Sequence, residues 1–187
     1  MILTKKRFYL YLIFVTFFIL RGVMAEDNRD IIYLQLKDGT VTIETRPDLA
    51  PKHVEQIKQL IIQKKYDGVV FHRVIEGFMA QTGDVEFGNS SNNSYDINRA
   101  GTGGSSLPNI VAEFSEANHK RGAVSMARSQ NPNSANSQFF ICFKDALYLD
   151  GQYTVWGYVI EGMDFVDNIN LGEPPKDPDK IIKMEIK

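Results

Sequence analysis

Hydrophobic and polar residues alternate along much of the chain, a pattern typical of β-strands with one buried face. The pair Asp38-Gly39 separates two alternating runs, which is a strong signal for a β-hairpin. Glu76-Gly77 separates two more runs and indicates a second tight turn. The expected strands are residues 31–37, 40–46, 71–75, 78–82, 123–127, 138–143, 154–160 and 181–186.

Two segments instead repeat their apolar residues at helical spacing. The first begins at Pro51, because proline is tolerated at the first position of a helix, and it runs to Lys65. The second comprises residues 162–169. Many short strands with two helices predict a mainly β domain, an all-β barrel in which a helix covers an open end.

Residues 86–106 are rich in asparagine, serine and glycine and predict a long loop. Long loops in compact domains are usually functional or mobile. This one ends in the glycine-rich residues 101–104, where the lack of side chains lets backbone approach a ligand closely. No Gly-Lys-Ser/Thr sequence follows, which excludes a phosphate-binding loop of the P-loop kind.

The beginning of the chain differs in composition from the rest. Three cations at residues 5–7 precede the apolar run 8–20, and the end at Ala25 completes the pattern of a secretory signal peptide. A membrane anchor is the alternative, but spanning a bilayer takes about 20 apolar residues and this run is shorter. We therefore expect residues 1–25 to be a signal peptide and residues 26–187 to form one domain.

Charge and cysteine content exclude several kinds of partner and cross-link. The formal net charge is −2, and removing the signal peptide removes only cations, so nothing favours binding to nucleic acid or to an anionic membrane. Cys142 is the single cysteine, so it cannot form an internal disulfide and is expected in the core. The three histidines are too scattered for a metal site, and His53 and His119 are expected at the surface.

Several motifs, in order along the chain, resemble the cyclophilins, the cyclosporin-binding peptidyl-prolyl isomerases. The likeness covers nearly everything from residue 31 to residue 187. It implies a closed eight-stranded antiparallel β-barrel capped by two α-helices, and catalysis of X–Pro bond rotation without cofactor or metal. We also expect a monomer that binds proline-containing polypeptides. The matching motifs are residues 71–84 (FHRVIEGFMAQTGD), 101–104, 122–127, 137–142 and 149–151.

The resemblance assigns catalytic roles to three residues of these motifs. Arg73 matches the arginine that donates toward the prolyl nitrogen, Gln81 matches the amide that positions it, and Phe140 belongs to the proline pocket. The adjacent His72 matches a structural support. Taken alone, residues 71–75 are better explained as a buried strand from which Arg73 reaches solvent. The matching substrate-binding residues are Phe78, Met79, Gly101, Ala127, Arg128, Gln138, Tyr148, Leu149 and Tyr153.

Three residues depart from the best-known cyclophilins. Arg128 stands where asparagine is usual, at a position that mostly offers its backbone. Tyr148 stands where cyclosporin-sensitive members carry tryptophan, and Tyr153 replaces a histidine, as in bacterial-type members. We therefore expect weak cyclosporin binding. Residues 126–128 and 153–156 also resemble bacterial rather than animal members. Together with the signal peptide, this favours a periplasmic isomerase that assists the folding of exported proteins, with the lumen of a secretory pathway as the alternative.

Two other functions remain open from the sequence. One is a non-catalytic module that holds proline-containing segments as a chaperone or scaffold. Arg73 and Gln81 favour the enzyme, because a pure binder needs the pocket but not the arginine. The more distant alternative is a membrane-anchored interaction protein that uses the loop 86–106.

Overall fold

A computed structural model describes residues 29–187, which fold mainly into β-structure. The strands follow the expected order with shorter bounds, and both expected helices are present. The strands are β1 (Ile31–Gln35), β2 (Thr40–Thr45), β3 (Arg73–Ile75), β4 (Met79–Thr82), β5 (Ala123–Met126), β6 (Phe139–Cys142), β7 (Val155–Glu161) and β8 (Lys183–Ile186). The helices are α1 (Pro51–Ile62), α2 (Met163–Asp167) and the short 3-10 helices η1 (Pro132–Ser134) and η2 (Leu147–Leu149).

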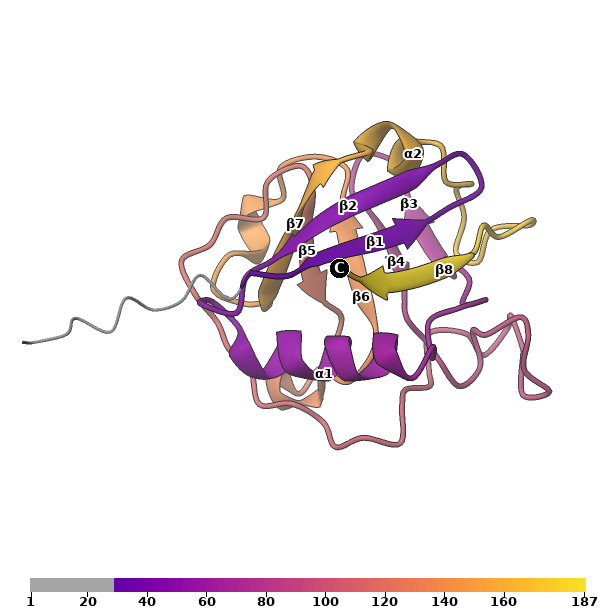
Figure 1. Cartoon of the computed structure of the whole chain (residues 1–187), viewed down its shortest axis with the longest axis horizontal. Coiled ribbons are helices and arrows are strands. Elements are labelled where there is room, and N and C mark those ends of the chain that lie inside the picture. Colours follow the sequence, from indigo (N-terminus) through magenta and orange to yellow (C-terminus); the bar gives the residue numbers. More distant parts are fainter. Residues whose placement is uncertain (1–28) are drawn as a thin grey trace, which may run out of the picture.

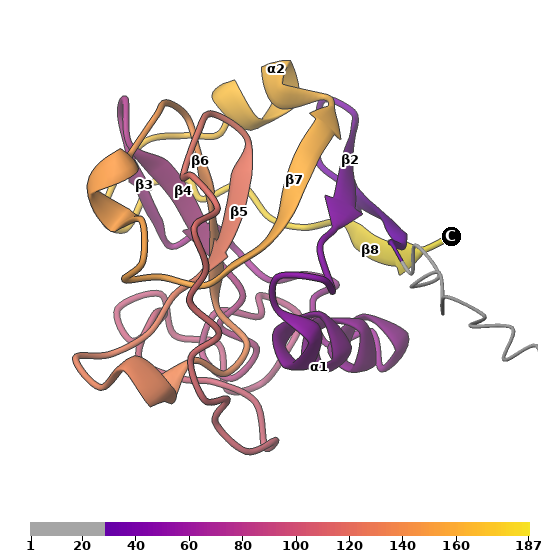
Figure 2. The same cartoon turned by 90° about the vertical axis from the view of Figure 1, so that its left-hand side faces the viewer.

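The strands form one antiparallel sheet that curves into a half-barrel. Their order is β3-β4-β6-β5-β7-β2-β1-β8, and each neighbouring pair is antiparallel. The helices α1 and α2 lie at opposite ends of this half-barrel in both views (Figures 1 and 2). The prediction of a mainly β fold with two capping helices is confirmed.

The expectation of a closed barrel is not confirmed, because the edge strands β3 and β8 do not pair with each other. The segments that precede these strands meet instead. The N–H of Phe71 donates to the carbonyl of Asp179, and the N–H of Ile181 donates to that of Val69. These contacts and the single bridge between Val70 and Lys180 join the two segments, but they do not continue into a ladder between β3 and β8.

Helix α1 closes one end of the half-barrel because one of its faces is apolar. It begins at Pro51, as expected, and ends at Ile62, shortly before Lys64 takes a positive φ of 54°. Alternation along the strands supplies the apolar surface on which it packs. The buried residues of α1 are His53, Val54, Ile57, Leu60 and Ile61.

The sheet is covered on part of its outer face as well. In β6, Phe139 and Ile141 join the large core inside the half-barrel, whereas Phe140 and Cys142 join a second cluster on the other side. Leu149, from η2, packs in this outer cluster. All four residues of β6 are therefore buried, although only two of them face the main core.

The burial of one cysteine and two histidines tests the expectations for these residues. Cys142 is buried as expected, and burial raises the pKa of its thiol to about 12. His53 and His119 are fully buried, so the prediction that they lie at the surface is wrong. Nδ1 of His53 lies 2.6 Å from Oε2 of Glu113, which supplies the polar partner that a buried imidazole requires.

The expected signal peptide, residues 1–25, lies outside the described residues, and so does the start of the expected domain at residue 26. Between residues 29 and 187, none of the helices has the length and apolar character needed to cross a bilayer.

Candidate active site

The three residues expected to be catalytic lie in one row across adjacent strands. Arg73 on β3 stands opposite Gln81 on β4, and Gln81 stands opposite Phe140 on β6. Ser125 on β5 is opposite Phe140 and extends the row. Directly opposed residues of antiparallel strands have their side chains on the same face, and each strand adds about 4.8 Å. The register of the sheet thus brings together residues that are far apart in the sequence.

A cluster of apolar side chains lies beside this row on the outer face. Met79, Phe140 and Leu149 are at most 8% exposed and pack in one cluster. The ring of Tyr153 meets that of Phe140 edge to face, with centroids 5.9 Å apart. Phe78 packs against the same cluster from the rim. The residues expected to bind proline are therefore together, in a cluster of aromatic and aliphatic groups that suits a small apolar ring.

A polar groove continues from the pocket toward the long loop. Nε2 of Gln81 donates to Oε1 of Gln138 at 3.0 Å. Nε2 of Gln138 in turn donates to the carbonyl oxygens of Gly101 and Gly103, at 3.0 and 2.7 Å. These residues, with Ala127, line a cavity of about 290 Å³. The expected groove residues are therefore together, and a chain of amide groups fixes them.

The partner of Arg73 differs from the expected one. Nε of Arg73 donates to Oε2 of Glu173 at 2.7 Å. Within residues 29–187 no hydrogen bond joins Arg73 to Gln81, whose amide donates to Gln138. Gln81 stands beside Arg73, but in this structure it orders the groove rather than the arginine.

Arg128, Tyr148 and Tyr153 lie at the outer cluster, where the side chain of Arg128 makes contacts of its own. Its guanidinium carbon lies 4.4 Å from the centre of the Tyr153 ring, and its Nη2 donates to the carbonyl of Gln152 at 3.1 Å. Tyr148 is 65% exposed and its ring lies 5.9 Å from that of Phe78. Arg128 thus braces one wall of the pocket, which a backbone-only role would not predict.

Asp84 is a site-building residue that the sequence reasoning missed. Its side chain is fully buried, and Oδ1 accepts hydrogen bonds from the N–H groups of Glu86 and Phe87. Oδ2 accepts from the N–H groups of Gly101 and Gly103 at 2.7 and 2.9 Å. One carboxylate therefore anchors both ends of the loop that presents its carbonyls to Gln138. Its position between a strand and a glycine-rich loop was the available signal.

The glycine at residue 101 is required by its surroundings. Its φ is +99°, and a Cβ there would lie 2.9 Å from the ring of His72. His72 is itself buried, and burial lowers the pKa of its imidazole despite the opposing effect of Asp84. His72 therefore packs beneath the glycine loop as a neutral group, which agrees with a structural rather than a catalytic use.

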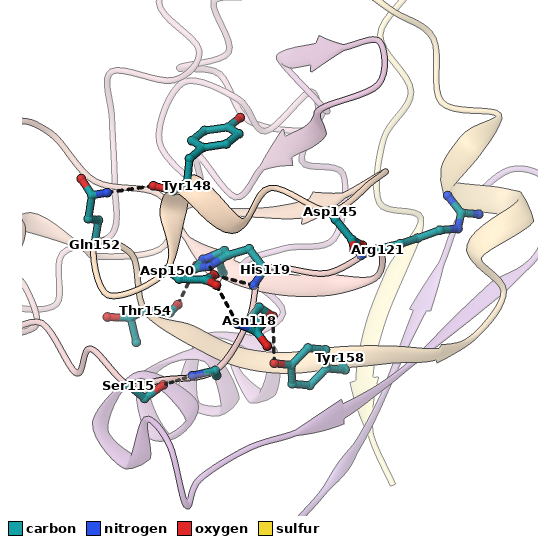
Figure 3. Close-up of polar contacts among 12 residues, drawn as sticks. Ser115, Asn118, His119, Arg121, Asp145, Tyr148, Asp150, Gln152, Thr154 and Tyr158 are labelled. Carbon is teal, nitrogen blue, oxygen red and sulfur yellow. Dashed lines mark hydrogen bonds and ion pairs between the residues drawn. The ribbon is translucent and has the colours of Figure 1, made fainter.

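His119 supports the pocket from beneath, which the sequence did not reveal. Its ring stacks near that of Phe140, with centroids 6.3 Å apart and planes at 17°. Its Nδ1 lies 2.8 Å from Oδ1 of Asp150, and its Nε2 lies 3.0 Å from the hydroxyl of Ser125. Figure 3 shows Asp150 reaching His119 and Asn118 from the loop that carries Tyr148. This network ties the outer loop to β5.

Asp150 is ionised in this network. Burial alone would raise the pKa of its carboxyl, but the hydrogen bonds from the backbone of His119 and the amide of Asn118 outweigh burial and lower it. A charged carboxylate at this position holds two elements together through charge-assisted hydrogen bonds. The floor and the wall of the pocket are thus fixed to each other.

Comparison with known proteins identifies the family. The profile described as cyclophilin type peptidyl-prolyl cis-trans isomerase/CLD matches residues 31–186. The chain belongs to this family. A probable peptidyl-prolyl cis-trans isomerase of Brucella abortus (strain 2308) is 59% identical to this cyclophilin over 167 residues, which cover 87% of this chain and 85% of the relative.

Solved structures agree with the assignment. The cyclophilin AquaCyp293 from Hirschia baltica superposes with a TM-score of 0.71 at 27% identity, covering 83% of this chain and 73% of that one. A cyclophilin type peptidyl-prolyl cis-trans isomerase from Cryptosporidium parvum, solved in the presence of the dipeptide Ala-Pro, gives 0.71 at 26% identity, with 84% and 98% coverage. The protein described here is a cyclophilin-type peptidyl-prolyl cis-trans isomerase, as the motifs predicted.

Proposed function

We propose that this cyclophilin rotates X–Pro bonds at the row formed by Arg73, Gln81 and Phe140. The observation that carries the proposal is the register of β3, β4 and β6, in which these residues are directly opposed. A cation, an amide and an aromatic floor on one face are the groups that this reaction needs. No nucleophile or proton transfer is required to rotate a bond.

The chemistry follows from the electronic structure of the amide. The barrier to rotation is about 20 kcal/mol because resonance makes the C–N bond partly double. In the twisted state the nitrogen regains its lone pair, so a donor aimed at it binds that state more strongly than the planar one. A charge-assisted hydrogen bond contributes about 1.5–3 kcal/mol, and a site that excludes water enlarges this contribution. Arg73 is the donor in this proposal.

The substrate is a proline-containing polypeptide. The proline ring occupies the apolar pocket of Phe78, Met79, Phe140 and Leu149. The residues before proline follow the groove along Gly101, Ala127 and Gln138, with Arg128, Tyr148 and Tyr153 at the rim. The relative solved in the presence of Ala-Pro supports this class of ligand.

The proposed setting is the periplasm, where the protein assists the folding of exported chains. The basic start, the apolar run 8–20 and the end at Ala25 support export and removal of residues 1–25. The protein acts as a monomer in this proposal. N-terminal sequencing of the exported protein tests the removal of residues 1–25, and the expected first residue is Glu26. An intact N-terminus in a washed membrane fraction would instead indicate an anchor.

A protease-coupled isomerase assay on Arg73→Ala and Arg73→Lys tests the catalytic proposal. Loss of one charge-assisted hydrogen bond predicts a fall in kcat/KM of about 10- to 150-fold for Arg73→Ala, with a smaller change in peptide affinity. Arg73→Lys should rescue poorly, because a flexible ammonium lacks the planar fork. Near-normal turnover in Arg73→Ala would refute the mechanism. An inactive unmodified protein that still binds proline peptides would favour the binding module.

A further inference from the structure

The loop after α2 brings a carboxylate to the guanidinium of Arg73. Nε of Arg73 donates to Oε2 of Glu173 at 2.7 Å, across 100 positions of sequence. In the part of the chain that the structure describes, this is the one hydrogen bond of the Arg73 side chain. Nothing in the motif pattern gave Glu173 a role, so its contact with Arg73 requires a separate explanation.

Two backbone hydrogen bonds hold this loop against β3. The N–H of Val74 donates to the carbonyl of Gly172 at 2.8 Å, and the N–H of Gly172 donates to the carbonyl of Val74 at 2.9 Å. This mutual exchange defines a hydrogen-bonded antiparallel pair. The flanking residues Arg73 and Glu173 are therefore opposite each other, with their side chains on the same face. Glu173 extends the row of the site beyond β3.

The backbone around Gly172 fixes where Glu173 lies. Gly172 has a φ of +147°, and a Cβ on it would lie 2.6 Å from Cα of Pro175 and 2.9 Å from the carbonyl oxygen of Pro174. The loop thus folds back tightly immediately after it pairs with β3. The approach of Glu173 to Arg73 is set by this main-chain geometry rather than by the reach of two long side chains alone.

The atom that Glu173 contacts matters for the chemistry. A guanidinium carries five N–H donors in a planar fork, and Nε bears one of them. A carboxylate on Nε leaves the four donors of the terminal nitrogens free for a substrate. Gln81 does not occupy them in this structure, since no hydrogen bond joins its side chain to Arg73 within residues 29–187.

We propose that Glu173 is a positioning residue for Arg73. It fixes the plane of the guanidinium through Nε, so that the terminal N–H groups point toward the nitrogen of the X–Pro bond. This inference rests on the catalytic role proposed for Arg73. Orientation of a reacting group can change a rate strongly even when binding is unchanged.

A purely stabilising ion pair is the other explanation. The side chains of Arg73 and Glu173 are 39% and 52% exposed, and exposed pairs of this kind add little to stability. Arg121 and Asp167 form an ion pair of similar exposure, 43% and 41%, with a shortest contact of 2.7 Å. Asp167 therefore offers a matched control for the removal of an exposed carboxylate.

The experiment measures kcat and KM for a proline peptide with Glu173→Ala, Glu173→Gln and Asp167→Asn. Glu173→Ala should lower kcat about tenfold with little change in KM, because the guanidinium is no longer held in one plane. Glu173→Gln keeps an oxygen that accepts from Nε–H and should retain most of kcat. Asp167→Asn should leave both parameters unchanged. A Glu173→Ala protein with normal or increased kcat would overturn the proposal.

A spectroscopic readout separates orientation from general electrostatics. The Nε–H resonance of Arg73 can be followed by ¹⁵N NMR in the intact protein. It should exchange slowly in the unmodified protein and in Glu173→Gln, and rapidly in Glu173→Ala. An Nε–H signal that is unaffected by Glu173→Ala would also overturn the proposal.

The double variant distinguishes failure of this inference from failure of the mechanism. If Glu173 acts through Arg73, adding Glu173→Ala to Arg73→Ala should cause no further loss of kcat. If Arg73→Ala is inactive while Glu173→Ala is normal, the positioning role fails and the catalytic role of Arg73 stands. If Arg73→Ala is fully active, the catalytic role itself fails.

Discussion

On β6, Phe139 and Ile141 turn into the half-barrel, while Phe140 and Cys142 turn outward, so one short strand serves two faces. The inner face joins one continuous apolar core with α1. The outer face holds a smaller apolar cluster, and the row of Arg73, Gln81 and Phe140 runs along it. Both faces result from the same alternation of side chains along the strand, but they place different requirements on the sequence.

The inner face requires apolar side chains that fill the core, whereas the outer face requires a particular pairing register between β3, β4 and β6. A core tolerates exchange among hydrophobic residues if total volume is kept. The row of Arg73, Gln81 and Phe140 depends instead on which residues are directly opposed, and a slip of one position would turn each side chain to the other face. Substitutions on the inner face should therefore change stability, and those on the outer face should change turnover or ligand binding.

The largest effect is expected at the rim, on an inhibitor. Tyr148 is 65% exposed, so Tyr148→Trp can be accommodated without repacking the core. Tryptophan adds a broader surface and an indole N–H, and each contributes about 1 kcal/mol or more. Cyclosporin binding should tighten by about 10- to 100-fold, while kcat/KM changes less than about twofold. Inhibition titrations on the two proteins measure both quantities.

Tyr33→Trp provides the control for Tyr148→Trp, since Tyr33 lies on β1, outside the row and the pocket. It should leave cyclosporin inhibition unchanged. If the unmodified protein is already inhibited as tightly as Tyr148→Trp, then Tyr148 does not determine sensitivity. A large loss of kcat/KM in Tyr148→Trp would mean that Tyr148 contributes to turnover as well as to inhibitor binding.

A matched pair on β6 tests the two faces most directly. Phe139→Leu removes aromatic volume from the inner core and should lower the free energy of unfolding by about 1–3 kcal/mol, with kcat/KM per folded molecule preserved. Phe140→Leu makes the same change on the outer face and should lower kcat/KM about tenfold. Urea unfolding and the isomerase assay measure the two effects. Similar effects of both variants on both measurements would contradict the division between faces.

Much of the fold was predictable because its signals are local. Alternation and turn residues predicted the strands in their correct order, and Pro51 marked the start of α1. Closure of the barrel was not predictable, because it depends on how segments far apart in the sequence meet. Phe71 belongs to an expected strand, yet its N–H pairs with Asp179 instead of extending β3 along β4.

The site divides in the same way. The resemblance to the cyclophilins assigned roles to Arg73, Gln81 and Phe140, and the register of the sheet aligns these residues. His119 was expected at the surface, because a polar residue in a loop carries no local sign of what later covers it. Asp84 was given no role, although its position before a glycine-rich loop was a signal. His119 is buried by a contact with Asp150, 31 positions away, and Glu173 reaches Arg73 across 100 positions.

The smallest expected effect is that of pH on the free energy of unfolding. Turnover should not share this pH dependence. Burial is the main cause that lowers the pKa values of His53 and His72, although Glu113 and Asp84 oppose it. The unfolded chain therefore binds more protons than the folded chain below about pH 6.5, so stability falls as pH drops through that range. Urea unfolding at about pH 7.5 and about pH 5.5 should show a lower free energy of unfolding at the lower pH.

Turnover should not follow this pH dependence. Rotation of an X–Pro bond involves no proton transfer, so kcat/KM per folded molecule should stay constant between about pH 7.5 and about pH 5.5. His53→Gln and His72→Gln should each reduce the pH dependence of unfolding, because each removes one histidine whose pKa is lower in the folded chain than in the unfolded chain. A sigmoidal change in kcat/KM near pH 6.5 that disappears in His72→Gln would instead assign His72 to catalysis. Constant turnover with falling stability would mean that both histidines support the fold, His72 beneath the groove and His53 in α1. Catalysis would then depend on the outer row that contains Arg73 and not on a histidine.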